Sequence, residues 1–262
     1  MKNDNYEEII TLKSRLISCP HGFSTRYGGV SEGIFASLNL GMNRGDDKEK
    51  VTENWRRFLE SCGITNNEFV CGAQVHSNNV HIADYCDLRP AYGPGQLIEA
   101  DGYVTDKIGI PLAIFVADCV PVLLYDDVNR VIGAIHCGWR STVADIQNET
   151  IRKMILLGAR EDCIKVCIGP AIFKCCFEVG YEVIEAVRKL IGERAGECYD
   201  LMNDKYMLDL REVVKIRFEM LGVPQNNIDM IGECTKCNPD RYWSHRFGGT
   251  NRGSMACVIE MK

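Results

Sequence analysis

Apolar positions recur along the chain with two different spacings. After Asp47, apolar residues stand three or four positions apart from Val51 to Cys62, and Gly63 follows them. A period of about 3.6 residues that ends at a glycine predicts an amphipathic helix. Three further stretches with this period predict helices, near 142–158, 180–192 and 209–222.

Short apolar runs rich in β-branched residues lie between the predicted helices. Runs of this length, bounded by polar turn residues, are typical of strands. The runs are 69–75, 112–116, 120–125, 131–135, 164–168 and 256–259. Helices mixed with hairpin-spaced strands indicate an α/β or α+β fold with mixed sheets. No repeat or Pro/Gly/Ser linker divides the chain, so we expect a single domain over 1–262.

The composition excludes several classes of protein. The formal net charge of −6 removes the basic surface that a general nucleic-acid binder needs. The N-terminal residues lack the apolar stretch of a signal peptide, and no run approaches the roughly 18 apolar residues of a membrane span. We therefore expect a cytoplasmic protein without nucleic-acid or membrane partners, whose 14 cysteines are mostly reduced.

Two apolar runs on either side of the polar turn 126–129 predict a β-hairpin. If Tyr125 pairs with Arg130, then Cys119 lies directly opposite His136 at the open end of the hairpin. Directly opposed residues have Cβ atoms about 4.5–5.5 Å apart, so both side chains can reach one metal ion. The hairpin therefore predicts two ligands of a metal site.

His76 ends another apolar run and supplies a third ligand. Two imidazoles and one thiolate, with no fourth protein ligand, are typical of a catalytic zinc that keeps one position open for water or substrate. Zinc would lower the pKa of such a water to about 7. Two other interpretations of the same residues stay open: a copper site, and a metal-free site in which His136 activates Cys119 as a nucleophile.

Other candidate residues have weaker patterns. Cys234 and Cys237 have the spacing of a metal knuckle, which leaves a structural zinc or a redox role open, although no second such pair follows. The adjacent Cys175 and Cys176 are expected to be packing residues. The Gly-rich segment around Arg26 can present a guanidinium and backbone N–H groups to a phosphate, although it lacks the Walker and dinucleotide fingerprints.

Three further arginines lie among glycine and aromatic residues, at positions where a planar guanidinium can bind phosphate or stack on a base. They are Arg140, Arg246 and Arg252.

Taken together, these segments resemble the laccase-domain family, also called multicopper polyphenol oxidase-like. Its members are described as purine nucleoside phosphorylases with added adenosine deaminase activity. The family places its zinc on residues that correspond to His76 of Gln74-Val75-His76, Cys119 of Ala117-Asp118-Cys119 and His136 of the segment 136–140. The matching segments are 21–31, 37–41, 74–76, 100–105, 117–119, 136–140, 168–172, 175–180, 208–210 and 234–237.

The resemblance implies a layered α/β/β/α fold and a zinc enzyme that cleaves adenosine, inosine and S-methyl-5'-thioadenosine with phosphate and also deaminates adenosine. For deamination we expect Asp118 to move the proton while a zinc-activated water attacks C6 of adenine. For phosphorolysis we expect Arg26 and Arg140 to hold the phosphate. Arg246 is expected at the substrate pocket, whose rim His245 would alter.

Three other functions are open at this point. A metal-free cysteine hydrolase would use Cys119 and His136. Copper-dependent phenol oxidation is the older description of the family, but multicopper chemistry needs more histidines than the five in this chain. A metal-stabilised interaction domain is the non-enzymatic alternative. A homodimer is one option for the assembly.

Overall fold

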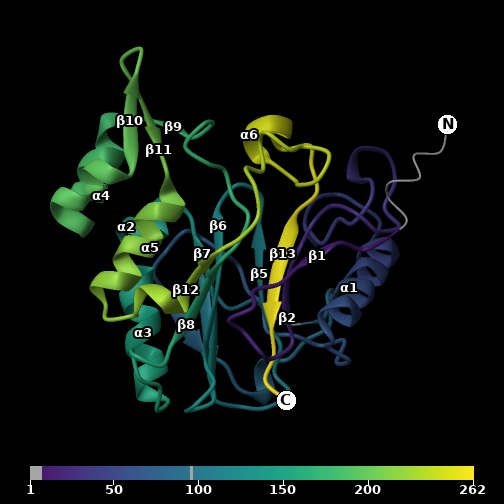
Figure 1. The fold of residues 1–262 in the computed structure, drawn as a ribbon. Helices are drawn as coiled ribbons and strands as arrows, with labels where there is room; N and C mark the ends of the chain where they lie inside the picture. The colour runs from purple at the N-terminus through teal and green to yellow at the C-terminus, as the bar shows by residue number, and fades with distance from the viewer. Residues whose placement is uncertain (1–7, 95–96) are drawn as a thin grey trace.

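A mixed six-stranded β-sheet lies at the centre of the computed structural model, which describes residues 8–94 and 97–262 (Figure 1). The polar N-terminal residues 1–7 lie outside the described residues. The strand order is β12-β8-β6-β7-β4-β3, with parallel pairs at both edges and antiparallel pairs between them. Its strands are β3 (Val80–Ile82), β4 (Gly102–Thr105), β6 (Val120–Asp126), β7 (Val131–Cys137), β8 (Lys165–Ile168) and β12 (Ile228–Met230).

A second, antiparallel sheet packs face to face on the first, and a small third sheet lies apart from both (Figure 1). The second sheet has the order β1-β2-β13-β5, so the C-terminal strand β13 lies between β2 and β5. Its strands are β1 (Thr11–Leu12), β2 (His21–Ser24), β5 (Leu112–Val116) and β13 (Met255–Ile259). The third sheet contains β9 (Glu178–Val179), β10 (Tyr199–Met202) and β11 (Lys205–Leu208).

Helices cover the outer faces of the two stacked sheets (Figure 1). Helix α1 packs on the four-stranded sheet, and α2, α3 and α5 lie over the six-stranded sheet, whereas α4 packs on α2, α5 and β11. In the described part of the chain, no helix has the length and apolar character needed to cross a membrane. The α-helices are α1 (Lys48–Cys62), α2 (Trp139–Val143), α3 (Ile146–Leu156), α4 (Tyr181–Ile191), α5 (Leu210–Met220) and α6 (His245–Gly248). The 3-10 helices are η2 (Gly33–Phe35), η3 (Tyr85–Asp87), η4 (Gly192–Glu197) and η5 (Gln225–Asn227).

Three apolar clusters fill the three spaces between these layers. One lies between the sheets and joins Leu123 and Ile132 of the larger sheet to Ile114 and Cys257 of the smaller. The second lies between the larger sheet and helices α3 to α5, and the third lies between the smaller sheet and α1. This arrangement confirms the predicted mixed α/β fold with α/β/β/α layers.

Helix α1 forms where the sequence predicts it. The side chain of Asp47 accepts hydrogen bonds from the backbone N–H groups of Glu49 and Lys50, which caps the start. Gly63, with a φ of 84°, ends the helix in the left-handed conformation that glycine adopts without strain. The predicted apolar residues form the buried face of the helix.

The predicted register of the β6–β7 hairpin is wrong by two residues. Tyr125 pairs with Ile132 rather than Arg130, and His136 lies opposite Pro121 rather than Cys119. The carboxylate of Asp126 accepts hydrogen bonds from two backbone N–H groups of the turn, so Asp126 ends β6 and the turn occupies 127–130. A shift of two residues preserves the face of each side chain, so His136 still points to the predicted side.

The run 69–75 is not a continuous strand, contrary to the prediction. It makes three isolated bridges to three different segments, at Phe69, Val70 and Ala73. Gly72 allows this path, because a Cβ atom at that position would lie 2.1 Å from the carbonyl oxygen of Ile98. The segment therefore behaves as an ordered connection that leads to His76.

Candidate metal and active site

His76, Cys119 and His136 converge at one end of the six-stranded sheet. Their ligand atoms all lie within 4.8 Å of one another. The Cys119 Sγ lies 3.8 Å from the His76 Nε2, and the two imidazole centroids are 4.8 Å apart. His136 belongs to β7, Cys119 directly precedes β6, and His76 lies in the loop before β3. The structure thus brings together the three residues that the sequence predicts as ligands.

Asp101 organises this group, and the sequence reasoning gave it no role. Its carboxylate is fully buried and accepts a 2.8 Å hydrogen bond from Nδ1 of His136. It also accepts hydrogen bonds from the backbone N–H groups of Val75, His76 and Ser77. Because Nδ1 of His136 is used in this way, Nε2 is the nitrogen left for a metal. The only signal in the sequence was an acidic residue directly before a strand.

The loop that carries His76 has an unusual backbone conformation. His76 has a φ of 61°, in the left-handed region that side-chain-bearing residues seldom adopt. The three N–H groups bound by Asp101 stabilise this turn. Gly138 packs against the ligands, since a Cβ there would lie 2.5 Å from Cδ2 of His76 and 3.4 Å from Sγ of Cys119. The site therefore requires glycine at position 138.

The electrostatics of the pair Cys119 and His136 favour a thiolate. Burial raises the pKa of the Cys119 thiol, but the neighbouring His136 imidazolium and the hydrogen bonds from both imidazoles lower that pKa to about 6. Burial likewise lowers the pKa of His136, but the Cys119 thiolate and the Asp101 carboxylate raise it above its ordinary value. A thiolate is the form of cysteine that binds a metal or attacks a substrate.

A cavity of about 770 Å³ opens beside the three ligands. It is large enough for a nucleoside-sized molecule. Asp118, Arg140 and Arg246, which the sequence singled out, all line it, and so does His245. Arg140 stacks on Trp139, with its guanidinium carbon 4.2 Å from the ring centroid. The cavity therefore combines charged and aromatic side chains around the ligands.

Asp118 lies at the cavity wall directly before Cys119. Its backbone φ is 90°, and the residue is 8% exposed. One carboxylate oxygen accepts a 2.6 Å hydrogen bond from the Thr235 hydroxyl, and the other accepts a 2.6 Å bond from the backbone N–H of Arg246. These contacts fix the carboxylate and join the segment before β6 to the segments that contain Thr235 and Arg246.

Arg26 lies away from this cavity, in contrast to the sequence-based expectation. Its guanidinium donates hydrogen bonds to the backbone carbonyls of Ala36 and Pro239 and stacks 3.9 Å from the Trp243 ring centroid. It is not among the residues that line the cavity. These contacts give Arg26 a structural position between two loops, so a role in phosphate binding does not follow from the structure.

Arg252 and Arg44 are the two arginines of the cavity best suited to bind an anion. Arg252 is 8% exposed, donates to the Gly253 carbonyl and leaves Nε without a hydrogen-bond partner. Burial and the nearby Arg44 lower the pKa of Arg252 to about 10. Among the described residues, no carboxylate forms an ion pair with either arginine. The sequence reasoning named Arg252 only as one candidate and gave Arg44 no role.

The donor set suits a transition metal. Two imidazoles and one thiolate match a zinc site with one position open, and also match the ligands of a single copper ion. The hydrogen bond from His136 to Asp101 is the outer contact that metal-binding histidines usually have. Two other histidines are used elsewhere in the two sheets: His21 contacts Ser14 and Cys19, and His81 pairs with Asp87.

Comparisons with known proteins identify a family and several relatives of this chain. A family model described as "Multi-copper polyphenol oxidoreductase laccase" matches residues 20–262. A "Purine nucleoside phosphorylase" of Bacteroides thetaiotaomicron is 36% identical over 91% of this chain and 90% of its own length. "Adenosine deaminase RL5", from an unknown prokaryotic organism, is 31% identical over 88% of this chain and 90% of its own length.

A solved structure also resembles the whole fold. The crystal structure of YlmD from Geobacillus stearothermophilus superposes with a TM-score of 0.89 at 28% identity, over 98% of this chain and 100% of that chain. Fold and sequence therefore both point to the same group of proteins.

Proposed function

The chain belongs to the multi-copper polyphenol oxidoreductase laccase family, and from this premise we propose that it is a zinc-dependent purine nucleoside phosphorylase. Its substrates would be adenosine, inosine and S-methyl-5'-thioadenosine together with inorganic phosphate, and it would also deaminate adenosine. The observation that carries this proposal is one cavity that holds both a three-ligand metal site and a buried arginine that forms no salt bridge among the described residues. Relatives named as a phosphorylase and as a deaminase support the two activities.

Phosphate binding is assigned to the arginines of the cavity. A buried guanidinium without a salt bridge is stabilised when an anion binds beside it. Arg252 meets this description, and Arg44 lies close enough to lower its pKa further. We assign the phosphate to this pair in place of Arg26, and we keep Arg140 at the substrate side of the cavity.

Phosphorolysis needs a phosphate oxygen held against C1' of the sugar. As the new C–O bond forms, the bond from C1' to the purine nitrogen breaks, and the nitrogen keeps the electron pair and takes up a proton. Positioning the two substrates provides most of the acceleration in such a reaction. The aromatic rings of Trp139 and Phe177 line the same cavity, with Arg140 over the first ring and Arg246 over the second, so a purine can stack on a ring or on a guanidinium.

The metal site is assigned to His76, Cys119 and His136. A bound zinc would supply Lewis acidity and activate a water molecule at neutral pH. Asp101 keeps the His136 ring oriented with Nε2 toward the ligand group. In deamination, a carboxylate must carry a proton between the water and the purine, and Asp118 lines the cavity with its carboxylate fixed by Thr235 and Arg246.

The test is adenosine turnover with and without phosphate, together with the metal content of the protein. We expect His136→Ala to lose the metal of this site and the phosphate-dependent release of adenine. His81→Ala is the matched control, because His81 pairs with Asp87 and does not line the cavity. A zinc-loaded wild-type protein that releases no base from any of the three nucleosides would refute the proposal.

A second candidate is a metal-free cysteine hydrolase. The lowered pKa of Cys119 favours it, because a thiolate beside an imidazolium is also an activated nucleophile. Thiol alkylation of metal-free protein separates the two candidates: it abolishes activity in the hydrolase, whereas a metal-free phosphorylase is inactive before alkylation. Copper in the same three ligands is the alternative metal, and oxygen uptake on a phenol would identify it.

We also propose a cytoplasmic location and one domain over 1–262. All fourteen cysteines are free in the structure, which suits a reducing compartment. The three apolar clusters are built around the same two sheets, which supports a single folding unit.

A further inference from the structure

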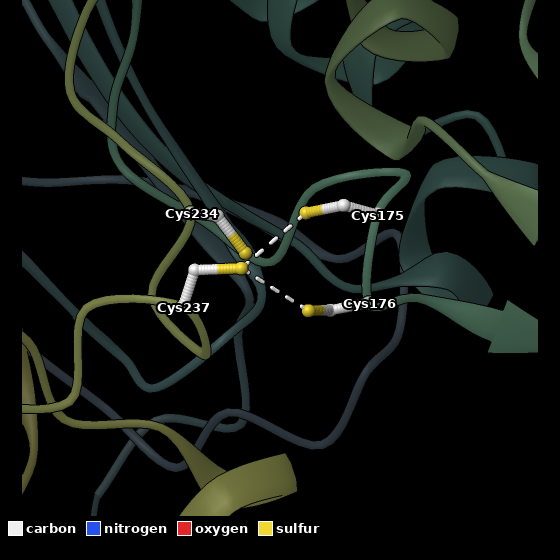
Figure 2. Close-up of side chains that lie close together, drawn as sticks. All are labelled: Cys175, Cys176, Cys234 and Cys237. Carbon is white, nitrogen blue, oxygen red and sulfur yellow. Dashed lines mark hydrogen bonds between the residues drawn. The ribbon is translucent and has the colours of Figure 1, made fainter.

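Four cysteines from two distant segments gather outside the site described above. Cys175 and Cys176 lie in the loop between β8 and β9, whereas Cys234 and Cys237 follow β12. Figure 2 shows the four sulfur atoms turned toward one another across the gap between these segments. The four Sγ atoms all lie within 4.8 Å of one another.

We propose that Cys175, Cys176, Cys234 and Cys237 bind a structural zinc ion. A zinc ion held by four thiolates at about 2.3 Å in a regular tetrahedron separates the sulfur atoms by about 3.8 Å. The Sγ of Cys237 lies 3.6 Å from that of Cys175 and 3.4 Å from that of Cys176 (Figure 2). The cluster is therefore already close to the size of a tetrahedral zinc site.

The surroundings of the cluster fit a metal better than simple packing. Cys175 and Cys237 are exposed, so they do not fill an apolar core. The backbone N–H of Phe173 donates a 3.4 Å hydrogen bond to the Sγ of Cys234, and such bonds stabilise a thiolate ligand. With four protein ligands the site would be closed, which is typical of structural rather than catalytic zinc.

The two segments are joined by other contacts that bring the cysteines into register. Strands β8 and β12 pair in parallel, and the bridge between Ala171 and Cys234 extends this pairing beyond the strands. The backbone N–H of Thr235 donates to the carbonyl of Ala171. This shared edge explains how residues about sixty positions apart, Cys175 and Cys237, come together.

The proposed zinc would fix two walls of the active-site cavity. Ile172 and Phe177, which flank the first cysteine pair, line the cavity. Thr235, between the second pair, donates to Asp118. A metal that ties these segments together would hold Asp118 and the cavity wall in place, at a position separate from the three ligands of the first site.

Metal analysis of single-site variants tests the proposal. We expect about two zinc ions per chain in the wild type, and about one in either His76→Ala or Cys237→Ser. Cys86→Ser is the matched control, since Cys86 is also exposed and lies outside the cluster, and it should keep both ions. If Cys237→Ser loses the zinc of the four cysteines but keeps the zinc of His76, Cys119 and His136, this proposal is tested separately from the proposed function.

X-ray absorption of the zinc in His76→Ala gives a second readout that needs no cysteine variant. We expect a shell of sulfur atoms alone at about 2.3 Å. A shell that contains nitrogen would overturn the proposal. So would an unchanged zinc content in Cys237→Ser, an iron–sulfur spectrum, or a disulfide among the four cysteines in protein purified with zinc.

Discussion

The carboxylate of Asp101 lies 2.8 Å from Nδ1 of His136, and both side chains are buried. The same carboxylate binds the backbone of the loop that carries His76. One acidic group therefore orients two of the three proposed metal ligands, through the ring of one and the backbone of the other. Burial raises the pKa of Asp101, but the hydrogen bonds from His136 and Ser77 outweigh burial and lower that pKa below its ordinary value.

Replacement of Asp101 by asparagine should weaken metal binding. In the variant, an amide nitrogen would replace one of the two carboxylate oxygens that now accept hydrogen bonds, and this nitrogen is itself a donor. The His76 loop and the His136 ring would therefore lose their fixed orientation. Loss of such an outer contact typically costs roughly 10- to 100-fold in metal affinity. Competition with a chelator measures this loss. Asp87→Asn is the control, because that carboxylate binds His81 and the backbone N–H of Asp84 and none of the three ligands, so the variant should leave affinity unchanged.

Gly138→Ala should also lower metal affinity, for a steric reason. Gly138 has a φ of −71°, which alanine adopts freely, so the added methyl group causes no backbone strain. That methyl group would lie 2.5 Å from Cδ2 of His76 and would displace the imidazole. Gly196→Ala is the control, because no atom lies within 4 Å of a Cβ there. Equal chelator competition for both variants would contradict the geometry.

Local patterns predicted helix α1 and the two hairpin strands that position Cys119 and His136, but they did not predict the irregular path of 69–75 toward His76. The 3.6-residue period of α1 reports which face is buried, and this is a property of neighbouring residues alone. The hairpin register was harder, because the side chain of Asp126 decides where the turn begins. The length of a hairpin turn depends on such side-chain contacts, which the pattern of apolar residues does not show.

Long-range pairing decided what the sequence did not predict. Cys175 and Cys176 meet Cys237 only because β8 and β12 pair in parallel, and no local pattern specifies that pairing. Arg26 showed the reverse case: its Gly-rich surroundings suggested an anion site, but its guanidinium donates to the carbonyls of the nearby Ala36 and the distant Pro239. Arg252 gained its significance from burial, which a single charged residue does not reveal in sequence.

Arg26→Ala should affect stability rather than phosphate use. The variant loses hydrogen bonds to Ala36 and Pro239 and the stacking on Trp243, which together contribute about 1–3 kcal/mol. Arg252→Ala should instead raise the KM for phosphate, because Arg252 lines the cavity. Denaturant unfolding and phosphate titration of the two variants measure the two effects. A raised phosphate KM in Arg26→Ala at unchanged stability would reverse the assignment.

Acid should destabilise the fold partly through His21. Its Nδ1 donates to the Cys19 carbonyl and its Nε2 accepts from the backbone N–H of Ser14, so the buried ring is neutral. Burial, the largest cause, lowers the pKa of His21 below its ordinary value. The unfolded chain therefore binds the proton first, and the stability present above about pH 6.5 is lost as the pH falls below it.

The variant His21→Gln isolates this effect, because glutamine can accept the Ser14 hydrogen bond but does not titrate. The free energy of unfolding of the wild type should fall more steeply than that of the variant between about pH 6.5 and pH 5.5, by up to about 1.4 kcal/mol per pH unit. Denaturant unfolding at several pH values measures both slopes, and His81→Gln, at a half-buried histidine paired with Asp87, serves as the control. Parallel curves for wild type and His21→Gln would show that His21 takes up its proton equally well in the folded and unfolded chain.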